Sequence, residues 1–399
     1  MHILAASSSL RAIRAIRYRD VGIWLPEPAD TRISASLESP SRLRTATSRR
    51  TATKKPTTPA LAYSHLADST LADLGIDFGT AIVNKRIETF RLGDLGPFNR
   101  EDPLELAVFA SDRKTVRKTV RANILRTDLP ASALIRVDPS LWITCPELTV
   151  MLLAKQLSPI ELAQVIMELC GSHSLHPDPT ARHEPPRYNV SPVMSLEGLA
   201  AFAQTARVRG DKATLRTAYQ LACEHSASPM ETNVTLLLSA SPALGGYGFP
   251  KPALNAPLMP PDEDLPHLSQ QSYALDLFWQ DCLADIECEG TEHHLDPLTA
   301  NASGDAISAW RSGHILKEES DRRRLRELQY LGIQVIPVTS YDLRSEYRTR
   351  SVARALAKRF QTCGVTDVSD VIARIDNPAA AATRAALLEK LSLVPAVPS

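Results

Sequence analysis

The feature that most constrains the fold is the order of strand and helix patterns in the C-terminal half of the chain. Tyr273–Trp279 and Leu283–Cys288 are short apolar segments of the kind that forms strands, with a turn between them. Glu318–Leu331 is a charged segment whose leucines recur at helical spacing. Ile333–Thr339 is apolar enough to form a buried strand. With a helix that begins near residue 228, these segments predict an α/β domain in which helices flank a mixed sheet.

The region before this domain has a different pattern, in which strand candidates come first and helices follow. The strand candidates are Leu104–Ala110, Ala133–Val137 and Leu141–Thr144. The helix candidates begin at Pro146 and Pro159 and continue with Ser195–Arg207 and Lys212–Cys223. Strands followed by helices predict an α+β region.

Domain boundaries follow from length and local composition. At 399 residues the chain is long enough for roughly two or three domains. Residues 41–59 are rich in Ser, Thr, Pro and basic side chains, which is typical of a flexible linker. We therefore divide the chain into a basic N-terminal segment with this linker (1–60), the α+β region (61–225), the α/β domain (226–345) and a helical C-terminal tail (346–399).

Charge and composition exclude several classes of protein. Lys plus Arg and Asp plus Glu balance at 45 each, so any basic binding surface must be local. The six cysteines include no Cys-x-x-Cys pair, which indicates reduced thiols rather than a disulfide framework or a zinc site. No apolar run approaches the ~18 residues that span a bilayer. The arginines at 11–19 suit a basic amphipathic helix or a transit peptide. We expect a soluble, cytoplasmic protein with no membrane partner.

Acidic side chains lie within the predicted strands, where isolated charges are expensive to bury. Asp276 falls inside an apolar strand and needs a partner, a proton or a bound cation there, unless it sits in a turn at the strand end. Glu287 and Glu289 are two residues apart and therefore share one face of the next strand. Two like charges so close repel each other unless a cation shares their site. Asp276 and Glu287 are thus candidate metal ligands, and all three are candidate catalytic residues.

Two neighbouring residues extend this candidate site, and each has a structural alternative. Glu231 ends the motif Ser-Pro-Met-Glu, where it is either a further metal ligand or the acidic member of a helix capping box. His293 follows the carboxylate strand closely enough to orient water, contact phosphate or transfer a proton. The alternative for His293 is a polar loop.

A carboxylate cluster of this kind is what phosphodiester hydrolysis requires. Carboxylate oxygens hold Mg²⁺ or Mn²⁺, which activates water and neutralises charge on the scissile phosphate. The helix that follows carries arginines that would line the phosphate path of DNA: Arg322, Arg323, Arg324 and Arg326. The alternative is that they form the solvated face of an amphipathic helix.

Several motifs occur in a fixed order across this domain. They are Ser-Pro-Met-Glu at a helix start, Asp-Leu-Phe-Trp, Ile-Glu-Cys-Glu-Gly-Thr-Glu-His-His, and Asp321-Arg-Arg-Arg324 before a strand. This order resembles a family related to very-short-patch-repair endonucleases. The resemblance implies a PD-(D/E)XK nuclease fold over residues 228–343. It also implies that Asp276 and Glu287 are metal ligands, that Glu289 replaces the usual aspartate, and that His293 takes the histidine position. No lysine stands in the Glu-x-Lys position of the broader superfamily.

A second motif precedes the domain. Trp142-Ile-Thr-Cys-Pro-Glu-Leu-Thr-Val-Met-Leu-Leu-Ala resembles the start of a helix in abortive-infection antitoxins of the AbiEi kind. Together the two resemblances imply a Mg²⁺-dependent DNA endonuclease or a nuclease-related defence protein, with DNA as its partner. The alternative is a non-catalytic, antitoxin-like transcriptional regulator that binds an operator or a toxin and carries a degenerate nuclease fold. Fold alone does not separate the two.

Overall fold

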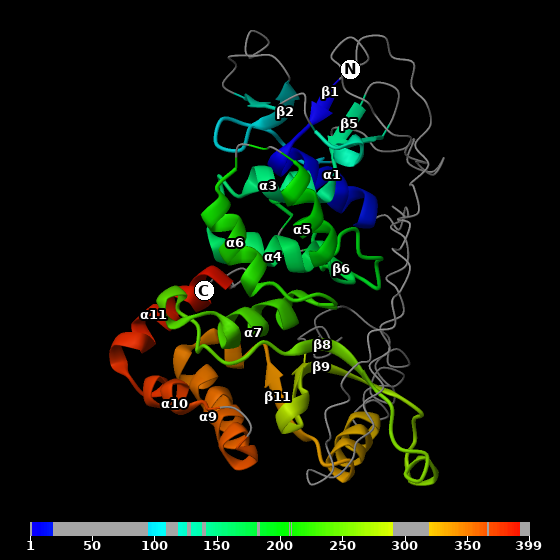
Figure 1. Cartoon of the computed structure of the whole chain (residues 1–399), viewed down its shortest axis with the longest axis vertical. Helices are drawn as coiled ribbons and strands as arrows, with labels where there is room; N and C mark the ends of the chain where they lie inside the picture. The colour runs from blue at the N-terminus through cyan, green and yellow to red at the C-terminus, as the bar shows by residue number, and fades with distance from the viewer. Residues whose placement is uncertain are drawn as a thin grey trace, which may run out of the picture. The chain divides into compact units, whose positions relative to one another are not determined.

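The computed structural model describes residues 2–18, 95–108, 119–125, 129–137, 141–181, 184–206, 208, 210–289, 319–364 and 367–391. These residues form two compact units, drawn in Figure 1: an N-terminal unit that ends at Thr232 and a C-terminal unit that begins at Asn233. Each unit combines helices with a sheet that contains parallel and antiparallel pairs. The protein is therefore a mixed α/β protein, as its sequence predicts.

The sheet of the N-terminal unit has the strand order β3-β2-β1-β5-β4. Its strands are β1 (His2–Leu4), β2 (Leu104–Val108), β3 (Val120–Ile124), β4 (Leu134–Arg136) and β5 (Leu141–Thr144). β1 lies in the middle, antiparallel to β2 and parallel to β5. The three strands predicted between residues 104 and 144 are confirmed. The central strand comes from the first residues of the chain, which the sequence did not mark as a strand.

Helix α1 (Ala6–Tyr18) follows β1, and most of its residues are buried, including two arginines. Arg17 donates to the carbonyl oxygens of Glu168 and Gly171, each at 2.8 Å. Arg14 forms a 2.6 Å ion pair with the buried carboxylate of Glu168. Residues 2–18 are therefore an integral part of the N-terminal unit rather than a separate basic segment, because their basic side chains have internal partners.

The helices after β5 are α3 (Pro146–Leu153), α4 (Pro159–Leu169), α5 (Leu196–Thr205) and α6 (Lys212–Leu221). A short strand pair, β6 (His173–Ser174) and β7 (Arg187–Tyr188), comes between α4 and α5 in the sequence. Helix α4 begins with a capping box, in which Ser158 Oγ accepts from the Glu161 N–H and the Ser158 N–H donates to the Glu161 carboxylate. The four helices predicted in this region are thus confirmed.

Replacing Ser158 with alanine should lower the free energy of unfolding by about 1 kcal/mol, because α4 loses the hydroxyl acceptor of its capping box. Ser158→Asp keeps an acceptor at this position and should retain most of the stability. Urea unfolding followed by circular dichroism measures both variants. Identical unfolding curves for the alanine variant and the unmodified protein would contradict the prediction.

The sheet of the C-terminal unit has the strand order β11-β10-β9-β8. Its strands are β8 (Ala253–Leu258), β9 (Tyr273–Trp279), β10 (Ala284–Glu289) and β11 (Gln334–Thr339). β8, β9 and β10 pair antiparallel, whereas β10 and β11 are parallel. The helix at 319–330 precedes β11. Its Leu328 and the following Leu331 pack with Leu275 in the core. The three strands β9, β10 and β11 and this helix match the predicted segments closely.

Three further helices of the C-terminal unit follow β11, and α7 (Pro229–Ser239) precedes its sheet. The three are α9 (Glu346–Cys363), α10 (Ser369–Ile375) and α11 (Pro378–Leu391). In α9, Phe360 packs its ring against Trp279 of β9, and Arg359 donates to the Cys282 carbonyl at 2.6 Å. The segment from residue 346 that the sequence analysis set apart as a tail therefore lies in the same compact unit as the sheet.

Candidate carboxylate and arginine site

Three carboxyl side chains lie on one face of the C-terminal sheet. β9 and β10 pair antiparallel, with Asp285 opposite Phe278. Continuing this register brings Glu287 opposite Asp276, and residues that face each other in an antiparallel pair have Cβ atoms about 4.5–5.5 Å apart. Asp285 precedes Glu287 by two residues and so shares its face. The structure thus brings together Asp276 and Glu287, which the sequence singled out, and adds Asp285 to them.

The neighbouring strand holds the Asp276 side chain in place. Its Oδ2 atom accepts a 2.8 Å hydrogen bond from the backbone N–H of Cys288. The side chain is half-buried, so this bond to an ionised acceptor is stronger than one in water. The backbone of β10 therefore holds the carboxylate of Asp276, which belongs to β9, next to Glu287.

Asp285 is the site residue that the sequence analysis did not single out. Its side chain is fully buried, and neither carboxyl oxygen has a hydrogen-bond donor among the described residues. Burial, then interaction with Glu287 and the charge of Asp276, raise the pKa of Asp285 well above its usual range. The raised pKa means that Asp285 keeps a proton at pH values where an ordinary aspartate is ionised. The strand period was the available signal, because Asp285 precedes Glu287 by the same two residues that separate Glu287 from Glu289.

Replacing Asp285 with asparagine is expected to raise the free energy of unfolding at neutral pH by about 1–3 kcal/mol. The pKa of this carboxyl is raised in the folded state. The folded chain therefore keeps a proton that the unfolded chain releases above about pH 4, and stability is lost as pH rises from the unfolded pKa through the folded pKa. An asparagine amide has no proton to release in this pH range, so this loss disappears.

Urea unfolding in the presence of EDTA, at about pH 5 and about pH 8, tests this prediction. The gain from Asp285→Asn should be larger at the higher pH. Asp281→Asn, which changes an exposed carboxyl in the turn before β10, is the matched control and should shift stability by less than about 0.5 kcal/mol. A variant at residue 285 that is no more stable than the unmodified protein at about pH 8 contradicts the prediction.

Arg324, from the helix at 319–330, supplies a positive charge to the cluster. Its Nη2 atom donates to Glu287 Oε1 at 2.5 Å and to the carbonyl oxygen of Ala274 at 2.5 Å. Burial works against the charge on Arg324, but the nearby carboxylates of Glu287 and Asp276 outweigh it and raise its pKa. This arginine therefore neutralises part of the negative charge that the three carboxyls bring together.

The structure gives Glu231 a capping role. The Glu231 N–H donates to Ser228 Oγ at 3.1 Å, and the Glu231 carboxylate accepts from the Ala227 N–H at 2.8 Å. Glu231 belongs to the N-terminal unit, whereas Asp276 and Glu287 belong to the C-terminal unit. This geometry supports the capping box that the sequence offered as the alternative to a metal ligand. The Glu231 carboxylate accepts from the N–H of Ala227, the residue before the cap residue Ser228, rather than from Ser228 itself.

The two remaining candidates of the predicted cluster differ in what is known of their position. Glu289 is exposed at the end of β10, where it pairs in register with Thr339 of β11. It lies on the same face of the strand as Glu287 and Asp285, but nearer to solvent. His293 lies outside the described residues.

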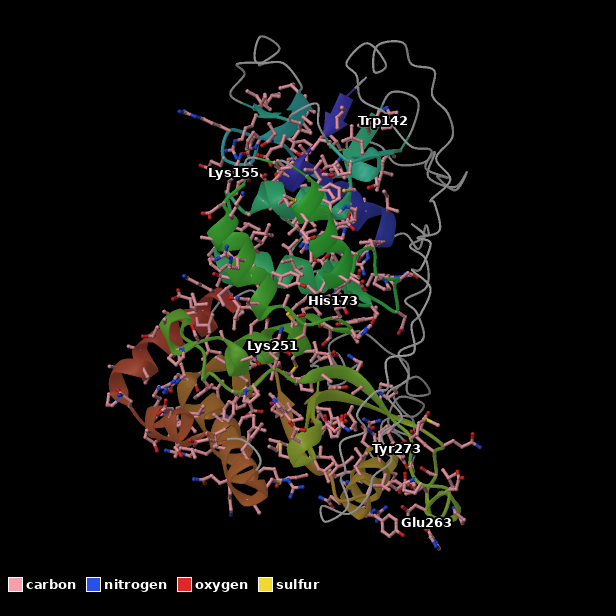
Figure 2. All side chains as sticks on the ribbon, viewed as in Figure 1. Trp142, Lys155, His173, Lys251, Glu263 and Tyr273 are labelled. Atoms are coloured by element: carbon pink, nitrogen blue, oxygen red, sulfur yellow. The ribbon has the colours of Figure 1, made fainter. Side chains whose placement is uncertain are left out.

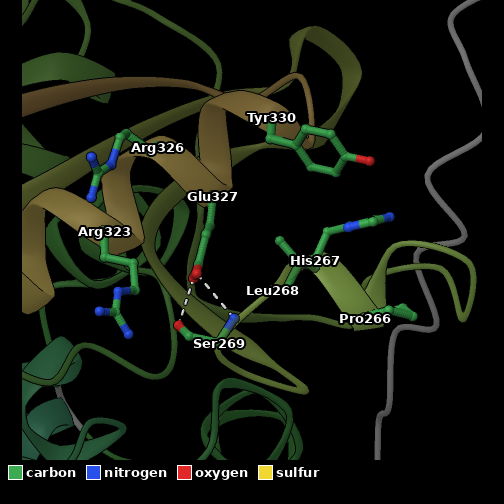
Figure 3. A pocket seen from close by; sticks show the side chains of 8 residues that line it. All are labelled: Pro266, His267, Leu268, Ser269, Arg323, Arg326, Glu327 and Tyr330. Atoms are coloured by element: carbon green, nitrogen blue, oxygen red, sulfur yellow. Dashed lines mark hydrogen bonds between the residues drawn. The ribbon is translucent and has the colours of Figure 1, made fainter.

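The arginines of the helix at 319–330 divide between two places. Arg324 contacts the carboxylates, whereas Arg323 and Arg326 line a pocket of about 550 Å³ together with His267 and Tyr330 (Figure 3). Arg322 is not part of this lining. In the structure, Arg324 therefore has different neighbours from Arg323 and Arg326.

Glu327 brings a negative charge to the same pocket, and this charge already has partners. Its carboxylate accepts from the Ser269 N–H and Oγ at 2.9 and 2.8 Å, and from Tyr273 Oη at 2.7 Å. Burial opposes the ionisation of Glu327, but the hydrogen bonds from Tyr273 and Ser269 outweigh it and lower its pKa. The same contacts, after burial, raise the pKa of Tyr273, labelled in Figure 2, to about 12. The pocket is therefore lined by the Glu327 carboxylate, whose oxygens already accept hydrogen bonds, and by Arg323 and Arg326.

The donor atoms of the carboxyl cluster suit a hard divalent cation. Carboxylate oxygens are the ligands that Mg²⁺ prefers. Neither carboxyl oxygen of Asp285 accepts a hydrogen bond from the described residues. In the described residues, however, no group of three or more His, Cys, Asp or Glu side chains has an arrangement that holds a metal ion. The guanidinium of Arg324 lies against Glu287 instead.

Comparison with protein-family models, with curated proteins and with solved structures gives no match to this chain. In the part of the chain that the structure describes, no helix is both long and apolar enough to cross a membrane. What the site does must therefore be argued from its own residues.

Proposed function

We propose that this protein is a metal-dependent nuclease that hydrolyses phosphodiester bonds in DNA. The observation that carries the proposal is the meeting of Asp276, Asp285 and Glu287 on one sheet face, with a buried carboxyl that lacks a hydrogen-bond donor. Buried carboxyls so close together are costly, and a bound cation offsets that cost directly. Proteins retain such clusters where the charge is used.

The order of elements supports the same proposal. In the C-terminal unit a helix is followed by three antiparallel strands, then by the helix at 319–330 and by β11 parallel to β10. This is the arrangement expected from the resemblance to very-short-patch-repair endonucleases and the PD-(D/E)XK fold. The carboxyls lie on the two central strands of that sheet, β9 and β10, where that resemblance implies the metal ligands.

Each residue of the cluster has a distinct part in the proposed reaction. Asp276, Asp285 and Glu287 would hold Mg²⁺ or Mn²⁺, which when bound activates water and stabilises charge on the phosphate. The bond from Cys288 N–H keeps one oxygen of Asp276 occupied and leaves the orientation of the other fixed. Arg324 neutralises Glu287 in the structure, and once released it is placed to bind a phosphate oxygen as a bidentate donor.

In the proposed function, DNA phosphates would bind at the pocket beside this helix. Arg323 and Arg326 lie on the same helix as Arg324, separated from it by one and two residues. Their charges would bind backbone phosphates and set the position of the DNA without reading its sequence. His267 lines the same pocket and adds a further donor.

A second function is favoured by one observation. The 2.5 Å pair between Arg324 and Glu287 fills the place where an ion would bind, and in a degenerate nuclease such a pair would permanently stabilise the fold. The protein would then be an antitoxin-like regulator that binds DNA or a toxin without cutting. The two functions differ in whether a divalent cation binds the carboxyl cluster.

The test is cleavage by the purified full-length protein. Supercoiled plasmid and a single-stranded circular DNA are incubated with the protein in Mg²⁺, in Mn²⁺ and in EDTA. The proposal expects nicked, linear or fragmented DNA with either metal and none in EDTA. Intact DNA under all three conditions, with no heat of Mn²⁺ binding by titration calorimetry, would overturn it in favour of the regulator.

A further inference from the structure

The turn after β11 is built rigidly next to the carboxyl cluster. The N–H and Oγ1 of Thr339 donate to the carboxylate of Asp342 at 2.8 and 2.7 Å. A short 3₁₀ segment, Asp342–Arg344, follows, and Ser345 then caps α9 by accepting from the Arg348 N–H. The chain between β11 and α9 is thus fixed at both ends by side-chain hydrogen bonds.

This turn presents an aromatic ring beside two arginines. The Tyr341 side chain is 51% exposed. The guanidinium of Arg348 lies 3.8 Å from the ring centroid and that of Arg344 lies 5.3 Å from it. Tyr347, in the first turn of α9, is 78% exposed. We call Tyr341, Arg344, Tyr347 and Arg348 the turn platform.

The two arginines of the turn platform have no acidic partner in the described part of the chain, where no carboxylate forms an ion pair with Arg344 or Arg348. Arginines further along the same helix behave differently, because Arg350 pairs with Glu346 and Arg354 pairs with Asp376. The platform therefore combines a half-exposed tyrosine ring with two arginines that have no ion-pair partner among the described residues, whereas Arg350 and Arg354 are both paired.

The position of the platform follows from the sheet register. Thr339 pairs with Glu289 in the parallel β10–β11 ladder, so the two residues are about one strand spacing, 4.8 Å, apart. Tyr341 is two residues further along, which adds at most about 7 Å of chain. Glu289 in turn lies two residues beyond Glu287. The turn platform thus lies close to the end of β10 that carries Glu289.

We propose that the turn platform binds single-stranded nucleic acid, with a base stacked on Tyr341 and the flanking phosphates paired with Arg344 and Arg348. Bases of a duplex are stacked on one another and cannot reach such a ring, whereas an unpaired base can. Arginines already stacked on a tyrosine are preorganised for phosphate and lose little freedom on binding. This inference rests on the proposed nuclease function, for which it names the substrate class as single-stranded or frayed DNA.

The test measures binding without cleavage, by fluorescence anisotropy of the full-length protein in EDTA. The probes are a labelled oligothymidine of about 20 nucleotides and a blunt hairpin duplex of similar charge. The unmodified protein should bind the single strand at least about tenfold more tightly than the duplex. Tyr341→Ala and Arg348→Ala should each weaken single-strand binding by about tenfold or more.

Two matched variants separate recognition from general effects. Tyr341→Phe keeps the ring and should bind like the unmodified protein, and Arg354→Ala removes an arginine of the same helix whose charge is paired and should change binding less than about twofold. Equal affinity for both probes, or no loss in Tyr341→Ala, overturns the inference. Loss in Tyr341→Phe equal to that in Tyr341→Ala also overturns it, because stacking is then not the cause.

The outcome for the platform is separable from that for the nuclease. Tight single-strand binding that depends on Tyr341, with no cleavage in Mg²⁺ or Mn²⁺, supports the turn platform and contradicts the proposed catalysis. Metal-dependent cleavage that Tyr341→Ala leaves unchanged on both substrates, together with unchanged binding, supports the proposed catalysis and contradicts the turn platform.

Discussion

Replacing Glu287 with glutamine is expected to lower metal-dependent DNA cleavage by more than about 100-fold, which corresponds to a loss of several kcal/mol of transition-state stabilisation. Glu287 is the carboxylate that lies between the other two acids and Arg324. Glutamine has almost the same shape but no charge, so it binds a divalent cation poorly and holds the guanidinium of Arg324 only by a hydrogen bond to a neutral acceptor. The fold should survive, because an amide oxygen still accepts from Arg324.

Cleavage of plasmid by this variant, in Mg²⁺ and in Mn²⁺, is measured beside Glu263→Gln. Glu263 is an exposed acid of the same unit, outside the carboxyl cluster, and its replacement should leave the rate within about twofold. Titration calorimetry with Mn²⁺ provides a second readout that does not depend on turnover, and it should show weakened binding only for the variant at residue 287. Equal cleavage by Glu287→Gln and the unmodified protein would exclude this cluster as the active site.

Replacing Arg384 with alanine is expected to lower the free energy of unfolding of the C-terminal unit by about 3–5 kcal/mol. This side chain of α11 is 1% exposed, and its Nε and Nη2 atoms donate to Glu346 Oε1 at 2.9 and 2.7 Å. Its other donors bind the carbonyl oxygens of Arg374 and Ile375 at the end of α10. The guanidinium also lies 4.7 Å from the ring centroid of Tyr247. One side chain thus joins three helices and a loop.

The cost is large because the partners of Arg384 stay behind. Glu346 would keep only Arg350 as a cation, and the carbonyl groups at the end of α10 would lose a buried donor. Arg354→Ala is the matched control, since that ion pair with Asp376 is more than half exposed on both sides and should cost no more than about 1 kcal/mol.

Urea unfolding and hydrogen exchange of peptides from α9 and α11 measure the two arginine variants. Exchange should accelerate throughout these helices in Arg384→Ala and remain unchanged in Arg354→Ala. Similar stability of the two variants would show that burial of this guanidinium contributes nothing beyond a surface ion pair.

Local sequence determined the elements whose residues carry their own pattern. The segments Tyr273–Trp279 and Leu141–Thr144 are strands with the bounds that the sequence predicts, because short apolar segments next to turns favour a pleated, buried conformation wherever they lie. The capping box at Ser158 and the leucine stripe around Leu328 similarly define their helices from within a few residues. Such signals need no knowledge of the rest of the chain.

Other elements depend on partners far away in the sequence. β1 is three residues long and forms the centre of its sheet only because β2, about 100 residues later, and β5, about 140 residues later, pair with it. β8 lies in a segment rich in Gly and Pro, a composition that disfavours a central strand. It forms at the sheet edge, where Pro257 removes one backbone donor at little cost.

The candidate site shows the same division. The sequence alone determined that acids recur on two adjacent strands and that arginines follow on a helix, because residue type and strand period are local properties. Only the tertiary structure decided that Asp285 is buried beside Glu287, that Arg324 turns to the carboxyls, and that Glu231 caps the start of α7. Burial and ion pairing are set by the packing of elements that are distant in sequence, and no local pattern encodes which of several similar charges that packing selects.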